Sequence, residues 1–252
     1  MSGTATSEAR HDWPRLCPLG LDGLLVSFGD RLSEPANRAA LAFRAALDAA
    51  RLPGVEETST SLASAFLRFD PLAEDPAQIE AEVAALLASR DWTHADLPRG
   101  RRLWRLPTVF GTELAPQLEE AAALAGLSPD AAIRSIAESR VRVQTIGFAP
   151  GQPYLGELPP AWDIPRQTGL TPKVPVGALT VAIRQLVLFA VSTPTGWRHI
   201  GQTGFRAFRP ESDTPFVLNP GDEVIFEPVS RDDHERLSGT GPDGGATSEP
   251  LE

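Results

Sequence analysis

Apolar residues in the first part of the chain, residues 17–106, switch between the spacing of strands and that of helices. Leu24, Val26 and Phe28 occupy every second position, which predicts a strand ending at Gly29-Asp30. A helix capped by Ser33 is expected next, because the following apolar residues recur every three to four positions, at Ala36, Ala40, Phe43, Leu47 and Ala50. Two more strands are predicted at 55–60 and 64–69.

A second helix begins at Asp75-Pro76, which combines a capping carboxylate with proline at the first helical position. Its inward stripe is Ile79, Val83 and Leu86. A last strand is expected through Leu103 and Leu106. The resulting order, β-α-β-β-α-β, is typical of ferredoxin-like domains.

Residues 107–230 have a different pattern, which predicts a second domain. Two helices open it, one over 114–125 and one after Ser128-Pro129. Short strands separated by Pro/Gly turns then follow, at 141–146, 178–183, 185–191, 197–202 and 223–227. Many short strands with one apolar side indicate a closed or nearly closed barrel, so the predicted fold class is α+β. Residues 1–16 and 231–252 lack an apolar period and are expected to be disordered tails.

Charge and composition narrow the classes of partner. The net charge is −10, which disfavours nucleic acid and anionic membranes. Cys17 is the only cysteine, so no intrachain disulfide can form and a cytoplasmic location is expected. Residues 1–13 lack the apolar core of a signal peptide. The most apolar run, 178–191, contains Arg184 and is too short to span a bilayer.

No self-contained catalytic signature is present: the chain has no Walker-type loop, no G-x-S-x-G and no H-E-x-x-H. The four histidines are scattered, and no zinc site is expected. The segment Gly147–Gly156 is expected to have a specific backbone conformation around Phe148 and Tyr154, because its glycines allow backbone angles that other residues avoid and its prolines fix φ. It is compatible either with a barrel corner or with one wall of a pocket.

Further turn motifs favour the pocket, and they lie at 165–166, 173–177, 194–197, 201–204 and 219–222. If these turns meet at one mouth of the barrel, Arg166 and Lys173 face an anion there, since Arg matches carboxylate or phosphate and Lys supplies a point charge. Tyr154 and Trp197 supply apolar walls. The alternative is that both cations are solvated surface charges.

These motifs resemble, in order and spacing, the KipI/PxpB family, also called allophanate hydrolase subunit 1 or the carboxyltransferase C/D-subdomain family. Its pattern GFxPGFxYLGxLP, PR, VPxGS, SPGGW, GRTP and PGDxVxF has counterparts at Gly147–Pro159, Pro165-Arg166, 174–178, 193–197, 201–204 and 220–226. The resemblance covers roughly residues 17–230.

The resemblance implies a ferredoxin-like N-terminal domain followed by a cyclophilin-like barrel. It implies one subunit of an ATP-dependent 5-oxoprolinase, which opens a lactam to glutamate together with a KipA/PxpC-like (carboxyltransferase A/B) subunit and a LamB-type subunit. ATP would be shared with a partner. The residues expected to bind the small lactam or amide are Phe148, Gly151, Tyr154, Arg166, Lys173, Gln185, Trp197, Gln202 and Thr203. No catalytic residue is assigned.

The chain departs from the family's pattern at several of these motifs. Gln152 replaces an aromatic residue, Leu170-Thr171 replaces a second Pro-Arg, and Gln202 replaces an arginine. Further departures are Gln117, Ile136, Thr193, Thr195 and Gly204. The residues that are retained, among them Arg166 and Trp197, leave open a pocket for a less charged ligand. Loss of the two arginines favours an alternative function, a non-catalytic regulatory module resembling the family's histidine-kinase inhibitor.

Overall fold

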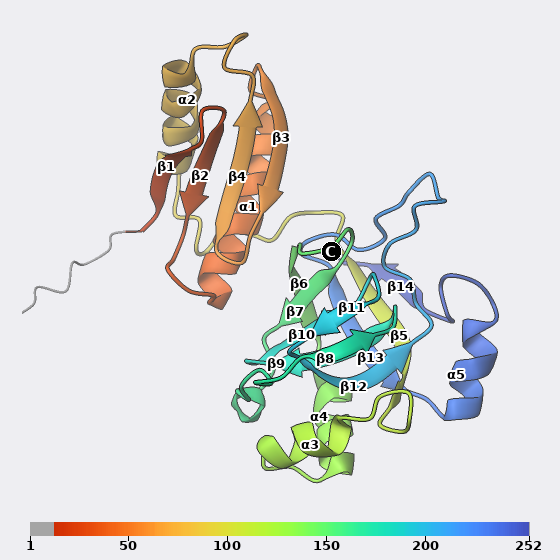
Figure 1. Ribbon diagram of the computed structural model, residues 1–252. Helices are drawn as coiled ribbons and strands as arrows, with labels where there is room; N and C mark the ends of the chain where they lie inside the picture. The colour runs from red at the N-terminus through yellow and green to blue at the C-terminus, as the bar shows by residue number, and fades with distance from the viewer. Residues whose placement is uncertain (1–12, 252) are drawn as a thin grey trace, which may run out of the picture. The chain divides into compact units, whose positions relative to one another are not determined.

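The computed structural model describes residues 13–251, and the chain divides after Asp96 into two compact units (Figure 1). Each unit has a hydrophobic core of its own. Residues 1–12, most of the N-terminal segment expected to be disordered, lie outside the described part of the chain. Residues 15 and 16 of that segment already belong to the first strand.

The first unit is an antiparallel sheet in the order β1-β2-β4-β3, and two helices share its core. Its elements are β1 (Arg15–Leu19), β2 (Gly23–Ser27), α1 (Glu34–Ala50), β3 (Val55–Thr60), β4 (Ser64–Phe69) and α2 (Pro76–Ala88). Both predicted helix starts are confirmed. Ser33 Oγ accepts a hydrogen bond from Ala36 N (3.3 Å), and Asp75 Oδ1 accepts one from Ala77 N (3.0 Å), as N-cap side chains do.

The predicted β-α-β-β-α-β order is not the order of this unit, which reads β-β-α-β-β-α. The strand expected through Leu103 and Leu106 lies in the second unit instead, as part of β5 (Arg102–Phe110). The edge position beside β2 is taken by β1, from the N-terminal side. Alternation of apolar residues identifies a strand but does not say which sheet it joins.

The second unit is a closed barrel. Its strands follow the order β12-β9-β10-β7-β6-β13-β5, and β5 pairs with β12 to close the ring. The barrel strands are β5, β6 (Val141–Ile146), β7 (Pro153–Gly156), β9 (Ala178–Ala182), β10 (Gln185–Leu188), β12 (Arg198–Thr203) and β13 (Glu223–Pro228). A separate ribbon pairs β8 (Thr171–Val174) with β11 (Thr193–Thr195). Two helices, α3 (Leu118–Leu124) and α4 (Pro129–Glu138), precede β6.

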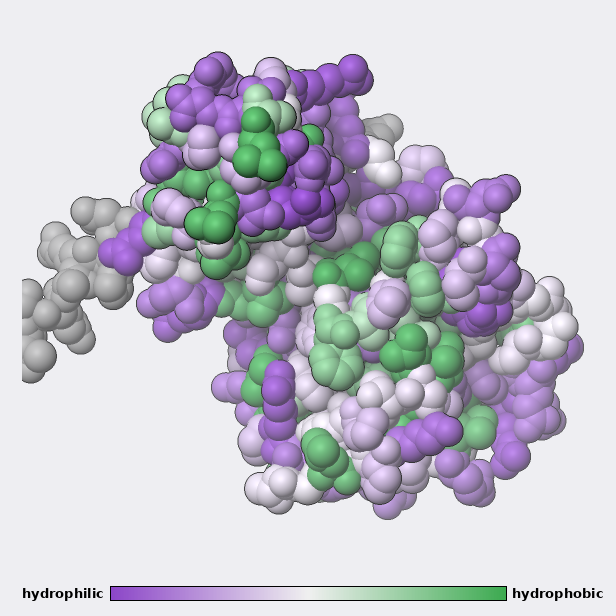
Figure 2. Space-filling view, turned by 45° about the horizontal axis from the view of Figure 1, so that its top comes forward, coloured by the Kyte–Doolittle hydropathy of each residue, from purple (hydrophilic) through white to green (hydrophobic). Residues whose placement is uncertain are grey.

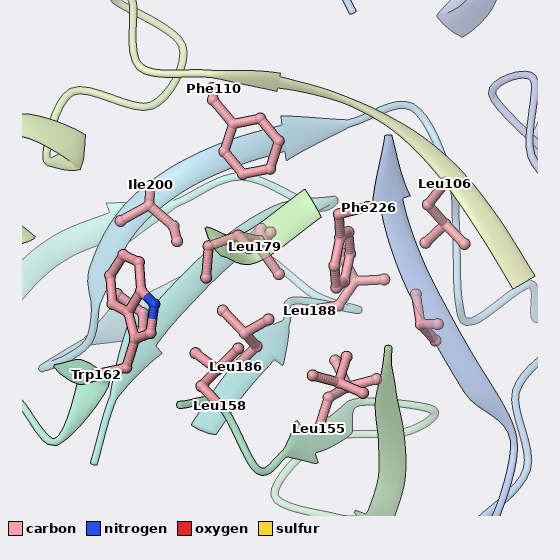
Figure 3. Packing of buried hydrophobic residues seen from close by; sticks show 14 of the residues in the cluster. Leu106, Phe110, Leu155, Leu158, Trp162, Leu179, Leu186, Leu188, Ile200 and Phe226 are labelled. Atoms are coloured by element: carbon pink, nitrogen blue, oxygen red, sulfur yellow. The ribbon is translucent and has the colours of Figure 1, made fainter. Parts of the chain in front are cut away.

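Large apolar side chains fill the barrel, as Figure 3 shows for the residues that converge from β5, β7, β9, β10, β12 and β13. Trp162, in the short 3₁₀ helix Pro160–Trp162, is fully buried among them. Its indole N–H donates to Ser135 Oγ of α4 at 3.0 Å, which satisfies the one polar atom of the ring. The barrel is therefore a packed core and not a channel.

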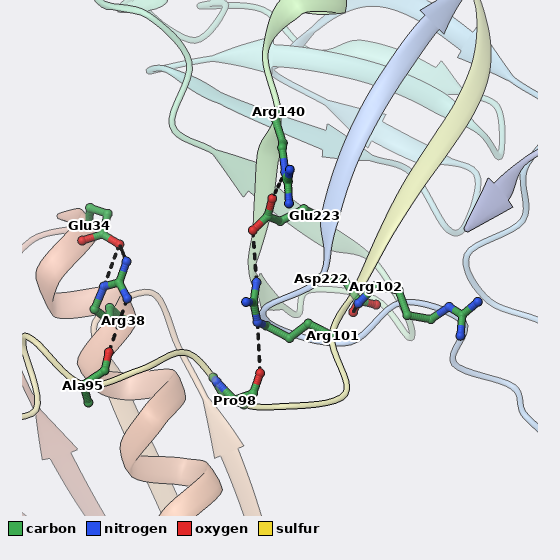
Figure 4. A network of polar contacts seen from close by, with 9 residues as sticks. All are labelled: Glu34, Arg38, Ala95, Pro98, Arg101, Arg102, Arg140, Asp222 and Glu223. Atoms are coloured by element: carbon green, nitrogen blue, oxygen red, sulfur yellow. Dashed lines mark hydrogen bonds and ion pairs between the residues drawn. The ribbon is translucent and has the colours of Figure 1, made fainter. Parts of the chain in front are cut away.

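Ion pairs and hydrogen bonds join the start of β13 to the chain segments at the start of β5 and before β6 (Figure 4). Arg101 and Arg140 both pair with Glu223, and Arg102 N donates to Asp222 Oδ1 at 2.8 Å. Burial raises the pKa of Asp222 above its ordinary value, although these hydrogen bonds act in the opposite direction. The Asn219–Asp222 turn is thus structural. In the first unit, Arg38 of α1 donates to Glu34.

Residues 231–251, expected to lie in a disordered tail, form α5 (Arg231–Ser238) and β14 (Thr247–Pro250). Ser230 Oγ caps α5 by accepting from Asp233 N at 3.1 Å. Strand β14 pairs with β5, and Arg102 Nη2 donates to Ser248 Oγ at 2.8 Å. Backbone hydrogen bonds and polar side chains attach this segment to the barrel. The sequence therefore shows no regular spacing of apolar residues there.

Candidate functional site

A cavity of about 400 Å³ lies against the outer side of the barrel wall, and we call it the outer pocket. Alternation along β10 explains its place. Leu186 and Leu188 enter the barrel core, whereas Val187 belongs to a smaller cluster with Phe189 and Trp197. The pocket therefore opens outside the barrel and not at its mouth, where the turns were expected to meet.

The lining of the outer pocket is mostly apolar, with a few polar groups. Its apolar walls are Tyr154, Val187, Phe189, Pro194 and Trp197, its polar groups include Gln152, Arg166, Gln167 and Thr195, and Phe148 and Leu170 also line it. Phe148 is 77% exposed and Leu170 is 69% exposed, so both form a rim. Among the described residues, no acidic side chain lines this cavity.

Arg166 supplies the positive charge of the outer pocket, and it stands on the aromatic wall. Its Cζ is 5.1 Å from the centroid of the Trp197 ring, and Trp197 meets Tyr154 edge to face at 6.1 Å. The adjacent Gln167 fixes this segment, since its backbone N donates to Gly196 O (2.7 Å) and its Nε2 to Trp197 O (3.0 Å). Within residues 13–251 the guanidinium forms neither an ion pair nor a hydrogen bond.

The Gly147–Gly156 segment shapes one side of the pocket. Gly151 has φ +67°, and a Cβ there would lie 3.0 Å from the Cβ of Phe208, so this position needs glycine for structural reasons. Phe148 also has a positive φ, +69°, which is uncommon for an aromatic residue. Gly151 is therefore a backbone requirement and not a pocket contact, whereas Phe148, Tyr154, Arg166 and Trp197 do come together.

The other predicted binding residues lie outside the outer pocket. Gln185 Nε2 donates to Gln144 Oε1 at 2.8 Å, and Gln202 Nε2 donates to Val176 O at 2.8 Å. Thr203 Oγ1 accepts from Phe205 N at 3.2 Å. These three buried side chains support turns and strands. Lys173 is exposed and lines a different cavity.

That second cavity, of about 780 Å³, lies on the side of α3 and β12. Gln117 organises its floor: its Nε2 donates to Gln167 Oε1 (2.8 Å), and its Oε1 accepts from His199 N (2.9 Å). Arg198, which is buried, pairs with Glu120 at 2.8 Å. In the sequence, Gln117 is notable only as a departure from a family pattern. No spacing of residues indicates that it contacts β12.

His199 also lines this second cavity and is buried, and its Nε2 has no hydrogen-bond partner among the described residues. Burial lowers the pKa of His199 below its ordinary value, because the imidazolium would be poorly solvated there. The ring is accordingly a neutral group at physiological pH. In this state one ring nitrogen can donate a hydrogen bond and the other can accept one.

The described residues offer no cluster of metal ligands, since no group of three or more His, Cys, Asp or Glu side chains is arranged to hold a metal ion. None of the helices in residues 13–251 has the length and apolar character needed to cross a membrane. On the face drawn in Figure 2, hydrophobic groups of the barrel unit form separate patches between hydrophilic ones.

Residues 14–218 match the family of carboxyltransferase domains, subdomains C and D. The chain is 30% identical over 223 residues to the B-type subunit of 5-oxoprolinase from Bacillus subtilis (strain 168), a match that covers 86% of this chain and 93% of that protein. The crystal structure of TTHA0988 is similar with a TM-score of 0.69 and 31% identity, covering 82% of this chain but 40% of that one. This chain thus spans less than half of TTHA0988.

The Kluyveromyces lactis urea carboxylase is similar with a TM-score of 0.70 over 91% of this chain and 23% of that chain. Its sequence identity is 16%, so this similarity is one of fold.

Proposed function

This chain belongs to the family of carboxyltransferase domains with subdomains C and D, and from that premise we propose that it is a subunit of an ATP-dependent 5-oxoprolinase whose outer pocket binds the lactam. The observation that carries the proposal is the free guanidinium of Arg166 over the Trp197 ring, in a cavity that no described acidic residue lines. Such a cavity favours a small ring that bears one negative charge.

The substrate named for the B. subtilis relative has this chemistry. 5-Oxoproline is a five-membered lactam with a carboxylate on the carbon next to nitrogen. Its methylene groups match the apolar walls formed by Tyr154, Val187 and Trp197, and its carboxylate matches the fork of Arg166. The cavity, at about 400 Å³, exceeds what so small a molecule needs, which leaves space for a second reactant or for a group from a partner.

ATP would reach the reaction from outside this chain, which has no phosphate-binding loop. We infer that a KipA/PxpC-like subunit and a LamB-type subunit complete the enzyme in the cytoplasm. In this arrangement the present chain would hold the lactam and exclude water from one side of it, while the phosphate chemistry would take place at the boundary with a partner.

A second candidate function is that of a regulatory module that binds a peptide. The exposed rim formed by Phe148 and Leu170 favours it, because exposed apolar side chains beside a pocket are typical of protein-binding surfaces. This alternative needs no turnover.

Reconstitution separates the two functions. The full chain is co-expressed with an A/B-type and a LamB-type protein from the same organism, and ADP release is measured with and without 5-oxoproline. The proposal expects ADP release that depends on 5-oxoproline and on this chain, with glutamate as product. A stable complex that releases no ADP with 5-oxoproline would contradict it and would favour the regulatory module.

A further inference from the structure

Gln152 is the least explained polar residue of the outer pocket. The residue lines the cavity but is only 1% exposed, and its Oε1 has no hydrogen-bond partner among the described residues. The backbone holds it in place, because Gln152 N donates to Ala149 O and Gln152 O accepts from Gly147 N, both at 3.1 Å. A buried amide oxygen without a partner destabilises the fold, so its presence calls for another reason.

Among the other buried amides of the barrel, Gln144 and Gln185 are hydrogen-bonded to each other, whereas Gln202 Oε1 also has no partner among the described residues but lines neither the outer pocket nor the second cavity. Gln185 and Gln144 lie on β10 and β6, on either side of β7, and pair with each other at 2.8 Å. Packing in this wall can therefore accommodate a buried glutamine with a partner. Gln152, at the end of the loop that leads into β7, differs from these residues in lining a cavity that a ligand can enter.

A primary carboxamide is complementary to a lactam. It presents an acceptor and a donor side by side, Oε1 and Nε2–H. A lactam ring holds its amide in the cis form, so that its N–H and C=O also lie side by side, and the two groups can form a pair of parallel hydrogen bonds. An open-chain trans peptide places N–H and C=O on opposite sides and cannot pair in this way.

We propose that Gln152 recognises the lactam amide of the substrate, accepting the ring N–H at Oε1 and donating from Nε2 to the ring carbonyl, while Arg166 binds the carboxylate. This inference depends on the proposed function for the identity of the ligand. The two residues would bind different parts of the substrate: Gln152 would form hydrogen bonds with the amide, which reacts, and Arg166 would bind the carboxylate, which does not react.

Selectivity against the product follows from the same pairing. Ring opening converts the lactam into a carboxylate and an ammonium group, so glutamate no longer offers an N–H and a C=O on one edge. A carboxylate in place of the ring carbonyl still accepts from Nε2, but Oε1 loses its donor unless the ammonium swings into the same plane. Gln152 would thus bind the substrate in preference to the product.

The test uses the substitution Gln152→Met, which keeps the length of the side chain and removes both polar atoms. Binding to the full-length wild-type and variant chains is measured by calorimetry with 5-oxoproline, with N-methyl-5-oxoproline, which lacks the ring N–H, and with cyclopentanecarboxylate, which keeps the ring and the carboxylate but has no amide. Thermal unfolding of both chains is recorded in parallel.

The proposal expects Gln152→Met to weaken 5-oxoproline binding about 10-fold or more, with cyclopentanecarboxylate binding unchanged and the Tm equal to or above that of the wild type. The wild type is expected to bind N-methyl-5-oxoproline more weakly than 5-oxoproline. Equal affinity of wild type and variant for 5-oxoproline would overturn the proposal. A lowered Tm together with equal loss of all three ligands would also overturn it, because Gln152 would then be a structural residue.

The same variant in the reconstituted complex distinguishes the two proposals. ADP release dependent on 5-oxoproline with an unchanged KM in Gln152→Met would overturn the role of Gln152 and leave the proposed function standing. Lactam binding that depends on Gln152, in a complex that releases no ADP, would uphold the role of Gln152 and overturn the proposed function. A wild-type chain that binds no 5-oxoproline, alone or in the complex, would overturn both.

Discussion

The guanidinium of Arg166 lies over the indole ring of Trp197, with 5.1 Å between Cζ and the ring centroid. The contact places a positive charge at an apolar wall, and no described acidic residue shares the lining. Gln167 holds the arrangement, because it bonds to the backbone of both Gly196 and Trp197. This exposed arginine forms no ion pair among residues 13–251, so its charge is available to an anionic ligand.

Replacing Arg166 with Ala should weaken binding of 5-oxoproline by about 10-fold or more, the effect of losing one charge-assisted hydrogen bond. The Tm should fall by a few degrees at most, because the exposed side chain stabilises the fold only through its cation–π contact with the ring of the buried Trp197, which contributes about 0.5–1 kcal/mol. Calorimetry with Lys173→Ala as the matched control tests this. Lys173 is also an exposed cation but lines the second cavity, so equal losses in the two variants would count against the outer pocket.

Leu186 and Val187 are neighbours on β10 that face opposite sides of the barrel wall. Leu186→Ala should lower the free energy of unfolding by about 2–5 kcal/mol, because it leaves a cavity in the main core. Val187→Ala should cost only about 1–2 kcal/mol, since it removes less apolar volume from the smaller cluster. Urea unfolding measures both. A larger loss for Val187→Ala would mean that the outer cluster, and not the barrel core, dominates stability.

Gly177 connects β8 to β9 where the chain passes close to β12. Its φ is +80°, and a Cβ would lie 2.2 Å from Thr203 O, so Gly177→Ala should destabilise the barrel by more than about 1 kcal/mol and lower the Tm by several degrees. Gly169→Ala is the matched control, because a Cβ there meets no atom within 4 Å. Similar Tm values for the two variants would show that the close approach of Gly177 to β12 is not retained in solution.

His199 should make stability depend on pH. Burial lowers its pKa in the folded chain below the ordinary value of 6.5, so the unfolded chain binds a proton first as the pH falls. This contribution to stability is fully present above about pH 6.5 and is lost as the pH drops toward the folded pKa. In His199→Gln, the difference in unfolding free energy between about pH 7.5 and about pH 5.5 should be smaller than in wild type. Burial also lowers the pKa of His234, and its contribution to the pH dependence of stability is the same in both chains. An equal difference in the two chains would contradict the assignment.

Local signals in the sequence predicted local structure well. Ser33, Asp75 and Ser128 each cap the helix expected after them, because capping depends only on neighbouring residues. The partner of β5 could not be read in this way, since its apolar positions fit either sheet. The ordering of β14 depends on Arg102 and on the backbone of β5, far away in the chain.

The residues of the candidate site could be predicted from the sequence where they lie in turns rich in glycine and proline. Phe148, Tyr154, Arg166 and Trp197 do meet, whereas Lys173 lies in another cavity and Gln202 supports the turn before β9. Which face of a strand a turn residue joins depends on register, and the sequence does not show register between distant strands. Gln152 stood out in the sequence as a departure from a pattern, but its unpartnered oxygen is visible only in the structure.

A crystal structure of the chain soaked with 5-oxoproline tests the central claim most directly. We expect the lactam to occupy the outer pocket, with its carboxylate at Arg166, its ring against Trp197 and its amide edge at Gln152. Density for 5-oxoproline in the second cavity, beside Gln117 and Lys173, with an empty outer pocket would contradict this claim.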